Sequence, residues 1–177
     1  MPARSEFEEQ YDAAVAGEEK EIQGALVGNP VSLLEPAQPI LVTRGTTVRD
    51  AIGKMKEARQ GAVCIVDDAG KLAGIFSERD VLTRVVGMDL DVHKTAVGQV
   101  MTANPESLRP TAKIAYALNR MSVGGFRNLP IVDETGKPIG IVFTRHFVKF
   151  IVSLFPEATL NLPQTDALKN PNMISGG

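Results

Sequence analysis

The apolar positions of the chain first show a helical spacing after residue 46. Thr46 or Thr47 can cap a helix at its N-terminus, because a threonine hydroxyl accepts a hydrogen bond from a backbone N–H two or three residues further on. Five apolar residues that follow fall on one helical face: Val48, Ala51, Ile52, Met55 and Ala58. This spacing predicts an amphipathic helix that packs on a core through one face.

Two short apolar runs follow this helix, over residues 62–66 and 72–76. The segment Asp67-Asp68-Ala69-Gly70 between them has the residue types of a tight turn, so the two runs predict a β-hairpin. Ser77 then stands where a second helix can begin. The apolar residues of that second helix are expected to point inward: Val81, Leu82, Val85 and Val86.

The whole series recurs 66 residues later without a gap. The offset pairs Ile65-Val66-Asp67 with Ile131-Val132-Asp133, and it also brings the turns, strands and helix starts of both halves into one register. We therefore interpret the chain as a duplication of one β-α-β-β-α unit. Residues 40–42 and 106–108 supply the first strands of the two copies in this interpretation.

The duplication predicts a fold of the α/β (α+β) class. Three-stranded units cannot cover both faces of their sheets alone, so the two repeats should pack sheet to sheet about a pseudo-two-fold axis. An N-terminal helix, weakened near Gly17, should precede them. The expected segments are an N-terminal helical extension over 1–30, repeat one over 31–90, repeat two over 97–155, and an extended or mobile tail over 156–177.

Composition and charge narrow the classes of function. The net charge is −2 and the basic residues are scattered, which argues against a nucleic-acid partner. Cys64 is the single cysteine, which excludes an intramolecular disulfide and a cysteine-based zinc site. The first ten residues lack the apolar core of a signal peptide, and the apolar stretch 147–155 is too short to span a bilayer. We expect a cytoplasmic protein without a membrane partner.

At this point the residues resemble a known family. The duplicated unit, with V-D-x-x-G-K before a Gly-Ile strand and S-E-R-D at a helix start, resembles the tandem CBS-domain pair of the stand-alone type over about residues 31–155. Residues 74–80 resemble the adenosine-binding pattern of that family, and residues 126–133 resemble the segment that leads into its central strand. The resemblance implies an adenine-nucleotide site in which Ser77 faces the phosphate and Asp80 binds the ribose hydroxyls. It also implies a set of residues around the base: Ile40, Leu41 and Val42.

The chemistry of the Ser77 segment agrees with such a role. A helix N-terminus leaves backbone N–H groups unpaired and attracts phosphate, and a carboxylate such as Asp80 can accept two hydrogen bonds from a ribose diol. Arg127 and Arg145 are further candidates, because a guanidinium binds phosphate in a bidentate manner; Arg79 is one as well, although many helix-start geometries point it away. The alternative is that Ser77 and Asp80 form a helix-capping pair and that the arginines make surface salt bridges.

The second copy departs from this pattern. The offset places Phe143 opposite Ser77 and His146 opposite Asp80, so the hydroxyl moves to Thr144 and the ribose carboxylate is missing. Phe143 is bulky enough to fill the second cleft. His146 either contacts a phosphate when it is protonated or is an exposed histidine at a helix start. We therefore expect one good site and one altered or empty site.

The sequence holds no recognisable catalytic set. Its two histidines and one cysteine are not arranged as nucleophile and base, and Walker A, H-E-x-x-H and G-x-S-x-G segments are absent. We predict a regulatory binding module rather than an enzyme, with no required cofactor and with AMP, ADP or ATP as candidate ligand. NAD and S-adenosylmethionine stay open as ligands. The main alternative is a structural or scaffolding dimer without a nucleotide, and a nucleotide hydrolase ranks last.

The last predicted helix is apolar nearly all round, over residues 147–155. One helix face cannot bury all of these side chains in a small monomer, so a homodimer is expected, since two-fold dimers are the commonest oligomers. The alternative is that the N-terminal helix or the tail covers this surface. We expect a ligand signal to pass to an unknown effector protein.

Overall fold

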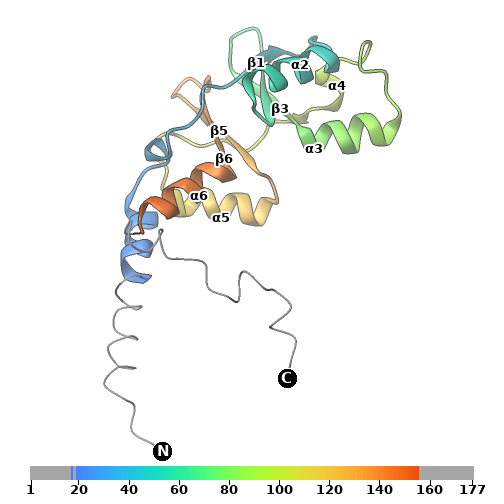
Figure 1. Cartoon of the computed structure of the whole chain (residues 1–177). Coiled ribbons are helices and arrows are strands. Elements are labelled where there is room, and N and C mark those ends of the chain that lie inside the picture. Colours follow the sequence, from blue (N-terminus) through green and yellow to red (C-terminus); the bar gives the residue numbers. More distant parts are fainter. Residues whose placement is uncertain (1–16, 18, 156–177) are drawn as a thin grey trace, which may run out of the picture.

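The computed structural model of the chain describes Gly17 and residues 19–155 (Figure 1). Gly17 and residues 19–28 are helical, which confirms the predicted N-terminal helix for this part. Leu26 from this helix packs on the core of the second repeat. The apolar positions 7–15 of the extension and the tail over 156–177 lie outside the described residues.

Repeat one contains the predicted helix and hairpin. Thr47 caps the helix, because its Oγ1 accepts a hydrogen bond from the backbone N–H of Asp50 at 3.1 Å. Val48, Ala51 and Met55 of the predicted stripe are buried and Ile52 is partly buried, whereas Ala58 in the last turn is exposed. The elements are β1 (Leu41–Thr43), α2 (Val48–Ala58), β2 (Ala62–Val66) and β3 (Leu72–Ser77).

Repeat two follows the same plan. Gly125 ends the first long helix with a φ of 65°, a left-handed conformation that suits glycine. Of the expected first strand over 106–108, only Leu108 bridges to a neighbouring strand, at Ile131. The elements are α4 (Val97–Val100), β4 (Thr102–Ala103), α5 (Ile114–Gly124), β5 (Asn128–Val132), β6 (Pro138–Phe143) and α6 (Thr144–Ser153).

The helical segment after β3 differs from the prediction. It consists of α3 (Glu78–Asp80), a π-helical turn η2 (Val81–Val85) and a 3-10 turn η3 (Val86–Met88). Leu82 and Val86 are each 67% exposed, so the expectation that both point inward is wrong. The π-helical turn has a different number of residues per turn from an α-helix, and the 3.6-residue spacing no longer predicts which side chains face the core. Val85 is buried and Val81 packs beside it.

The two repeats exchange their N-terminal segments. A short 3-10 helix, η1 (Val31–Leu34), precedes repeat one but packs in the core of repeat two, while α4 packs in the core of repeat one. The Val31 N–H donates to the Ala112 carbonyl at 2.7 Å, and the Val97 N–H donates to the Thr46 carbonyl at 2.8 Å. The two bonds are related by the 66-residue offset, so the exchange is reciprocal.

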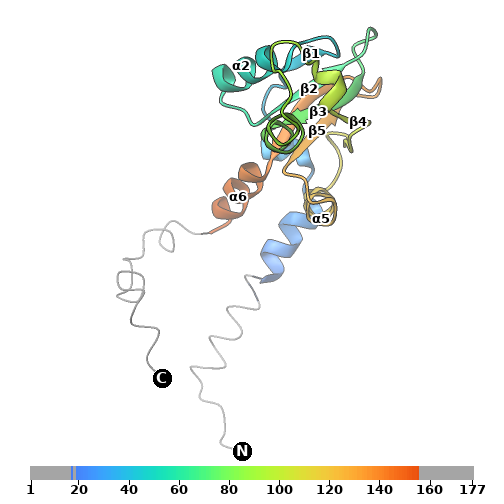
Figure 2. The same cartoon turned by 90° about the vertical axis from the view of Figure 1, so that its right-hand side faces the viewer.

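The sheets are exchanged in the same way. In the first sheet the order is β1-β2-β3-β4, with β1 parallel to β2 and the other pairs antiparallel, so β4 from the second half completes it. β5 and β6 form the hairpin of the second sheet, and Ala37 from the first half bridges to Ile141 of β6. Figure 2 shows the strands in the middle of the molecule, with α2, α5 and α6 around them.

A third cluster of buried side chains joins the two sheets. Cys64 and Ile75 from the first sheet meet Ile141 and Phe143 from the second. The predicted packing of sheet on sheet is thereby confirmed. Cys64 is fully buried there, and burial raises the pKa of its thiol to about 12, so it serves as a small apolar core residue.

Candidate functional site

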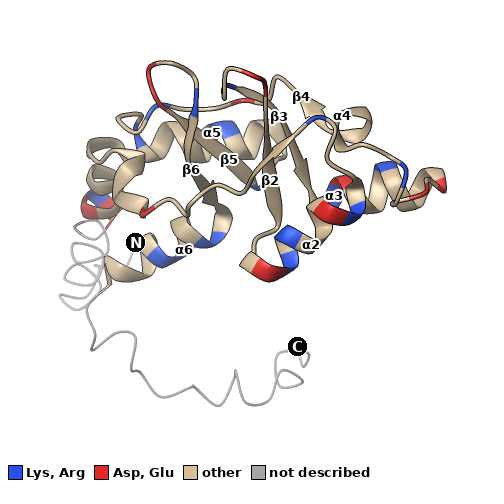
Figure 3. Ribbon diagram, turned by 90° about the horizontal axis from the view of Figure 1, so that it is seen from above, with Lys and Arg blue, Asp and Glu red and all other residues tan. Residues whose placement is uncertain are grey.

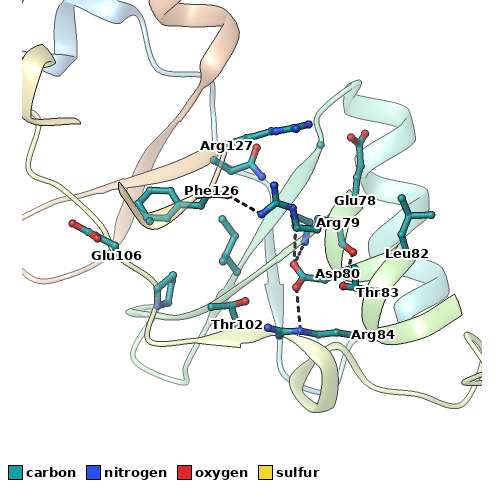
Figure 4. A pocket seen from close by; sticks show the side chains of 17 residues that line it. Glu78, Arg79, Asp80, Leu82, Thr83, Arg84, Thr102, Glu106, Phe126 and Arg127 are labelled. Atoms are coloured by element: carbon teal, nitrogen blue, oxygen red, sulfur yellow. Dashed lines mark hydrogen bonds and ion pairs between the residues drawn. The ribbon is translucent and has the colours of Figure 1, made fainter. Parts of the chain in front are cut away.

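A cavity of about 570 Å³ opens between the two repeats (Figure 4). Most of its walls come from three segments: residues 77–84 at the helix start after β3, residues 102–106 at β4 and beyond, and residues 124–128 from the end of α5 to the start of β5. The exchange of β4 into the first sheet is what brings the second segment beside the first. The volume of the cavity lies in the usual range of small-ligand sites.

Ser77 and Asp80 form a capping box at one wall. The backbone N–H of Ser77 donates to Asp80 Oδ2 at 2.9 Å, and Ser77 Oγ donates to the same oxygen at 2.7 Å. Asp80 is 7% exposed, so these bonds satisfy a carboxylate that would otherwise be costly to bury. The capping alternative for this pair is therefore present in the structure.

Arg84 holds the other oxygen of Asp80. Its Nε lies 3.4 Å from Asp80 Oδ1, and its Nη1 donates to the carbonyl of Val100 at 3.0 Å. Arg84 did not figure among the residues predicted from the sequence, because the irregular turns after Asp80 conceal which side chains share a face. A spacing of four residues between an acid and an arginine at a helix start is the signal that could have found it.

Two arginines line the cavity without a carboxylate partner among the described ion pairs, namely Arg79 and Arg127. Arg79 Nη1 donates to the carbonyl of Gly125 at 2.7 Å and so reaches across from repeat one to repeat two. Figure 3 shows acidic and basic residues adjoining at the start of α3, where Arg79 lies between Glu78 and Asp80. A ligand in the cavity would meet both guanidinium groups.

The three residues predicted around the base lie elsewhere. Ile40, Leu41 and Val42 do not line the cavity, and β1 is at the opposite edge of the first sheet from β4. Val42 is 5% exposed in the core of repeat one. The exchange of N-terminal segments explains this placement, since the segment beside Ser77 is the N-terminal segment of repeat two.

Sequence reasoning missed the residues that line the cavity where Ile40, Leu41 and Val42 were expected. Thr102, Pro105 and Glu106 line the cavity on that side. The 66-residue offset pairs Glu106 with Ile40, so the repeat itself held the signal. The offset did not show that the N-terminal segment of each repeat packs against the other repeat.

The second copy arranges its equivalent residues differently. Phe143 is 4% exposed, and the guanidinium of Arg145 lies over its ring at 4.0 Å from the centroid. Thr144 is exposed, and its backbone N–H donates to the carbonyl of Arg127 at 3.2 Å. None of the three predicted residues Thr144, Arg145 and His146 lines the cavity of the first copy.

His146 takes over the capping role that Asp80 has in repeat one. Its Nδ1 accepts a hydrogen bond from the backbone N–H of Phe143 at 3.4 Å, and its ring meets the Phe143 ring edge-on at a centroid distance of 5.5 Å. It is half-buried, so the interpretation of an exposed histidine is wrong. Burial, followed by the charges of Arg145 and Lys149, lowers its pKa below the ordinary 6.5.

Metal sites and membrane-spanning helices are both absent from the described part of the chain. No group of three or more His, Cys, Asp or Glu side chains is arranged there to hold a metal ion. Among the same residues, no helix combines the length and the apolar character needed to cross a membrane.

The sequence of the chain matches one protein family twice. The model of the CBS domain matches residues 36–87 and 97–153. The chain belongs to the CBS domain family. Both matches fall within the two structural repeats, so the fold is that of a CBS domain pair, as the resemblance implied. The cavity therefore lies between two CBS domains.

The curated relatives of this chain are longer proteins that match it over part of their length. The meiotically up-regulated gene 70 protein of Schizosaccharomyces pombe is 35% identical over 122 residues, which cover 68% of this chain and 17% of that protein. The chain spans about one fifth of the length of the first curated relatives that it matches. The activities of those longer proteins are therefore not transferred to it.

Two solved structures are similar in fold and carry ligands. The crystal structure of CBSX2 in complex with AMP has a TM-score of 0.58 at 25% identity and covers 71% of this chain and 97% of that one. The CBS domain pair of protein MJ0100, in complex with 5′-methylthioadenosine and S-adenosyl-L-methionine, has a TM-score of 0.62 at 20% identity, covering 69% and 98%. Each of these two proteins of similar fold thus binds an adenosine compound.

Proposed function

We propose that this CBS domain pair is a regulatory module that binds an adenine nucleotide or a related adenosine ligand in the cavity between the repeats. The observation that carries the proposal is the set of side chains that the cavity brings together: Ser77, Asp80, Arg79 and Arg127. A serine and a carboxylate suit a ribose, and guanidinium groups suit phosphate. The AMP complex of a relative with the same fold supports this ligand class.

The capping box leaves room for a ribose. An ionised carboxylate offers about four lone-pair sites. In Asp80, Oδ2 already accepts from Ser77 twice and Oδ1 faces Arg84, so Oδ1 can still accept one hydroxyl. A second hydroxyl would replace the Ser77 Oγ bond. Capping and ligand binding are therefore compatible roles for the same pair.

Isothermal titration calorimetry with AMP, ADP, ATP, NAD and S-adenosylmethionine tests the proposal. We expect saturable binding of at least one of these ligands and its loss in Asp80→Asn. A control variant, Thr47→Ala, removes a helix cap outside the cavity and should leave binding unchanged. Absence of binding by the wild type for every ligand at millimolar concentration would overturn the proposal.

A structural module without a ligand is the second candidate. The observations that favour it are the internal hydrogen bonds of Ser77 with Asp80 and the buried Phe143 at the equivalent place in repeat two. A double variant Ser77→Ala, Asp80→Ala separates the two candidates. If it abolishes nucleotide-induced thermal stabilisation while the protein stays folded, the scaffolding role is contradicted. We assign no catalytic step to either candidate.

We further propose that the module acts as a homodimer and passes its signal to an effector protein. Val148 and Val152 on α6 are 56% and 43% exposed, and an exposed apolar helix face is a common subunit interface. Sedimentation velocity of the wild type and of Val148→Glu, Val152→Glu tests this. The proposal expects a dimer that dissociates in the variant, and a wild-type monomer at micromolar concentration would contradict it.

A further inference from the structure

The acidic residues at the cavity are mostly paired with arginines. Asp80 lies beside Arg84. Glu106, in the segment that follows β4, receives two hydrogen bonds from Arg120 of α5: Nε donates to Oε1, and Nη2 donates to Oε2 at 2.8 Å. This bidentate geometry is the strongest arrangement for an arginine and a carboxylate. Each of these two lining carboxylates is thereby neutralised by one guanidinium.

The charges that remain are mainly positive. Arg79 donates to a neutral carbonyl and Arg127 enters no described ion pair, so neither guanidinium is compensated by a carboxylate. The only other acidic residue that lines the cavity is Glu78, which is exposed. The cavity therefore carries a net positive charge as long as Glu106 is neutralised.

Arg120 acts on the cavity from outside it. It does not line the cavity, whereas Glu106 does. Figure 4 shows the Glu106 carboxylate turned away from Arg79 and Asp80. The hydrogen bonds from Arg120 lower the pKa of Glu106 below its ordinary 4.5. A glutamate is ionised at neutral pH with or without this partner, so loss of Arg120 would add a free negative charge at the rim.

We infer that the cavity selects adenosine ligands of net negative charge over those that are neutral or of net positive charge, and that Arg120 determines this selectivity by neutralising Glu106. The inference rests on the proposed function and names the ligand class of the same site. Three adenosine compounds of different charge probe it: AMP is anionic, 5′-methylthioadenosine is neutral, and S-adenosylmethionine carries a sulfonium cation. A single charge at the rim changes the affinities of AMP and S-adenosylmethionine in opposite directions.

The experiment is calorimetric titration of the three compounds at one pH and ionic strength. We expect the wild type to bind AMP about tenfold more tightly than S-adenosylmethionine. In Arg120→Gln, the ratio of the two affinities should fall by about fivefold to tenfold, with 5′-methylthioadenosine unchanged within about twofold. Glu106→Gln, Arg120→Gln should restore a ratio close to that of the wild type, because both charges are then removed.

A matched control separates the effect of Arg120 on the affinity ratio from the effect of a change in the net charge of the protein. Arg109 also belongs to repeat two, but it donates to the backbone carbonyl of Glu134 at 3.2 Å and does not line the cavity. Arg109→Gln should leave the ratio unchanged. If Arg120→Gln does not fold, Glu106→Gln serves instead, and it should raise the ratio by about threefold because Arg120 is then uncompensated.

The outcomes are distinguishable. Equal changes for all three compounds in Arg120→Gln, or an unchanged ratio, would overturn the selectivity and leave the proposed function standing. The same holds if the wild type prefers S-adenosylmethionine or 5′-methylthioadenosine. If the wild type binds none of the three compounds, this inference fails, and if it also binds none of ADP, ATP and NAD, the proposed function fails with it.

Discussion

Arg79 in repeat one donates a hydrogen bond of 2.7 Å to the carbonyl of Gly125, the residue that ends α5 in repeat two. The bond joins two walls of the candidate cavity through an exposed side chain. A phosphate that binds this guanidinium would compete with the Gly125 carbonyl, because a charge-assisted hydrogen bond to phosphate is stronger than one to a neutral carbonyl. Ligand binding would then alter the contact between the repeats.

Arg79→Gln should weaken AMP binding about tenfold, since one charge-assisted bond to phosphate is lost. Calorimetry measures this loss. Arg145 is the equivalent residue of repeat two, where it lies over the Phe143 ring, and Arg145→Gln should leave AMP binding unchanged within about twofold. Equal losses in the two variants would contradict a specific role for Arg79.

The capping box predicts a graded loss of stability. Ser77→Ala removes the hydroxyl donor to Asp80 and should lower the free energy of unfolding by about 1 kcal/mol. Asp80→Ala also leaves the Ser77 N–H and Arg84 without their acceptor, so its cost should be larger, about 2–3 kcal/mol. Urea denaturation checks the order, and a smaller effect of Asp80→Ala than of Ser77→Ala would show that the box is not formed.

His146 predicts a pH dependence of stability. Its pKa is lowered in the folded chain, so the unfolded chain binds the proton more readily. The stability that the neutral ring provides is present above pH 6.5 and is lost as the pH falls from there through the folded pKa. Protonation of Nδ1 would also remove the acceptor for the Phe143 N–H.

Thermal unfolding between pH 5 and 8 measures this dependence. His146→Asn should flatten the fall in melting temperature below about pH 6.5, the ordinary pKa of histidine. His93 is the other histidine of the chain and is exposed, so His93→Asn should retain the fall. A pH profile that is identical in both variants and the wild type would contradict the role of His146.

The exchange of N-terminal segments predicts where core mutations act. Val31 and Val97 are both fully buried, the first in the core of repeat two and the second in the core of repeat one. Each Val→Ala change should cost about 2 kcal/mol because it leaves a cavity. Hydrogen exchange should increase in α5 and β5 for Val31→Ala, and in α2 and β2 for Val97→Ala. The opposite assignment would rule out the exchange.

The internal repeat predicted most of the fold. The hairpins and the helix start at Thr47 depend on local residue preferences, and the structure has both of them. Two features could not be predicted from spacing alone. The π-helical turn over Val81–Val85 breaks the 3.6-residue period. The exchange of η1 and α4 between repeats depends on tertiary packing, which an offset between two halves does not encode.

The candidate site was predicted where it depends on one continuous segment. Ser77, Arg79 and Asp80 follow directly from the helix start after β3, and the cavity includes them. The wall at Thr102 and Glu106 was missed, because it depends on which repeat supplies the neighbouring strand. Arg127 of repeat two was a candidate from the sequence and also lines the cavity, but the sequence did not show that its segment and the one at Thr102 meet Ser77.

The central claim is that one cavity, at Ser77 and Asp80, binds an adenine nucleotide. Calorimetric titration of the wild type and of Asp80→Asn with AMP is the most direct test, with His146→Asn as the equivalent change in repeat two. We expect one AMP per chain in the wild type and in His146→Asn, and none in Asp80→Asn. Binding of AMP by Asp80→Asn with the affinity of the wild type would contradict it.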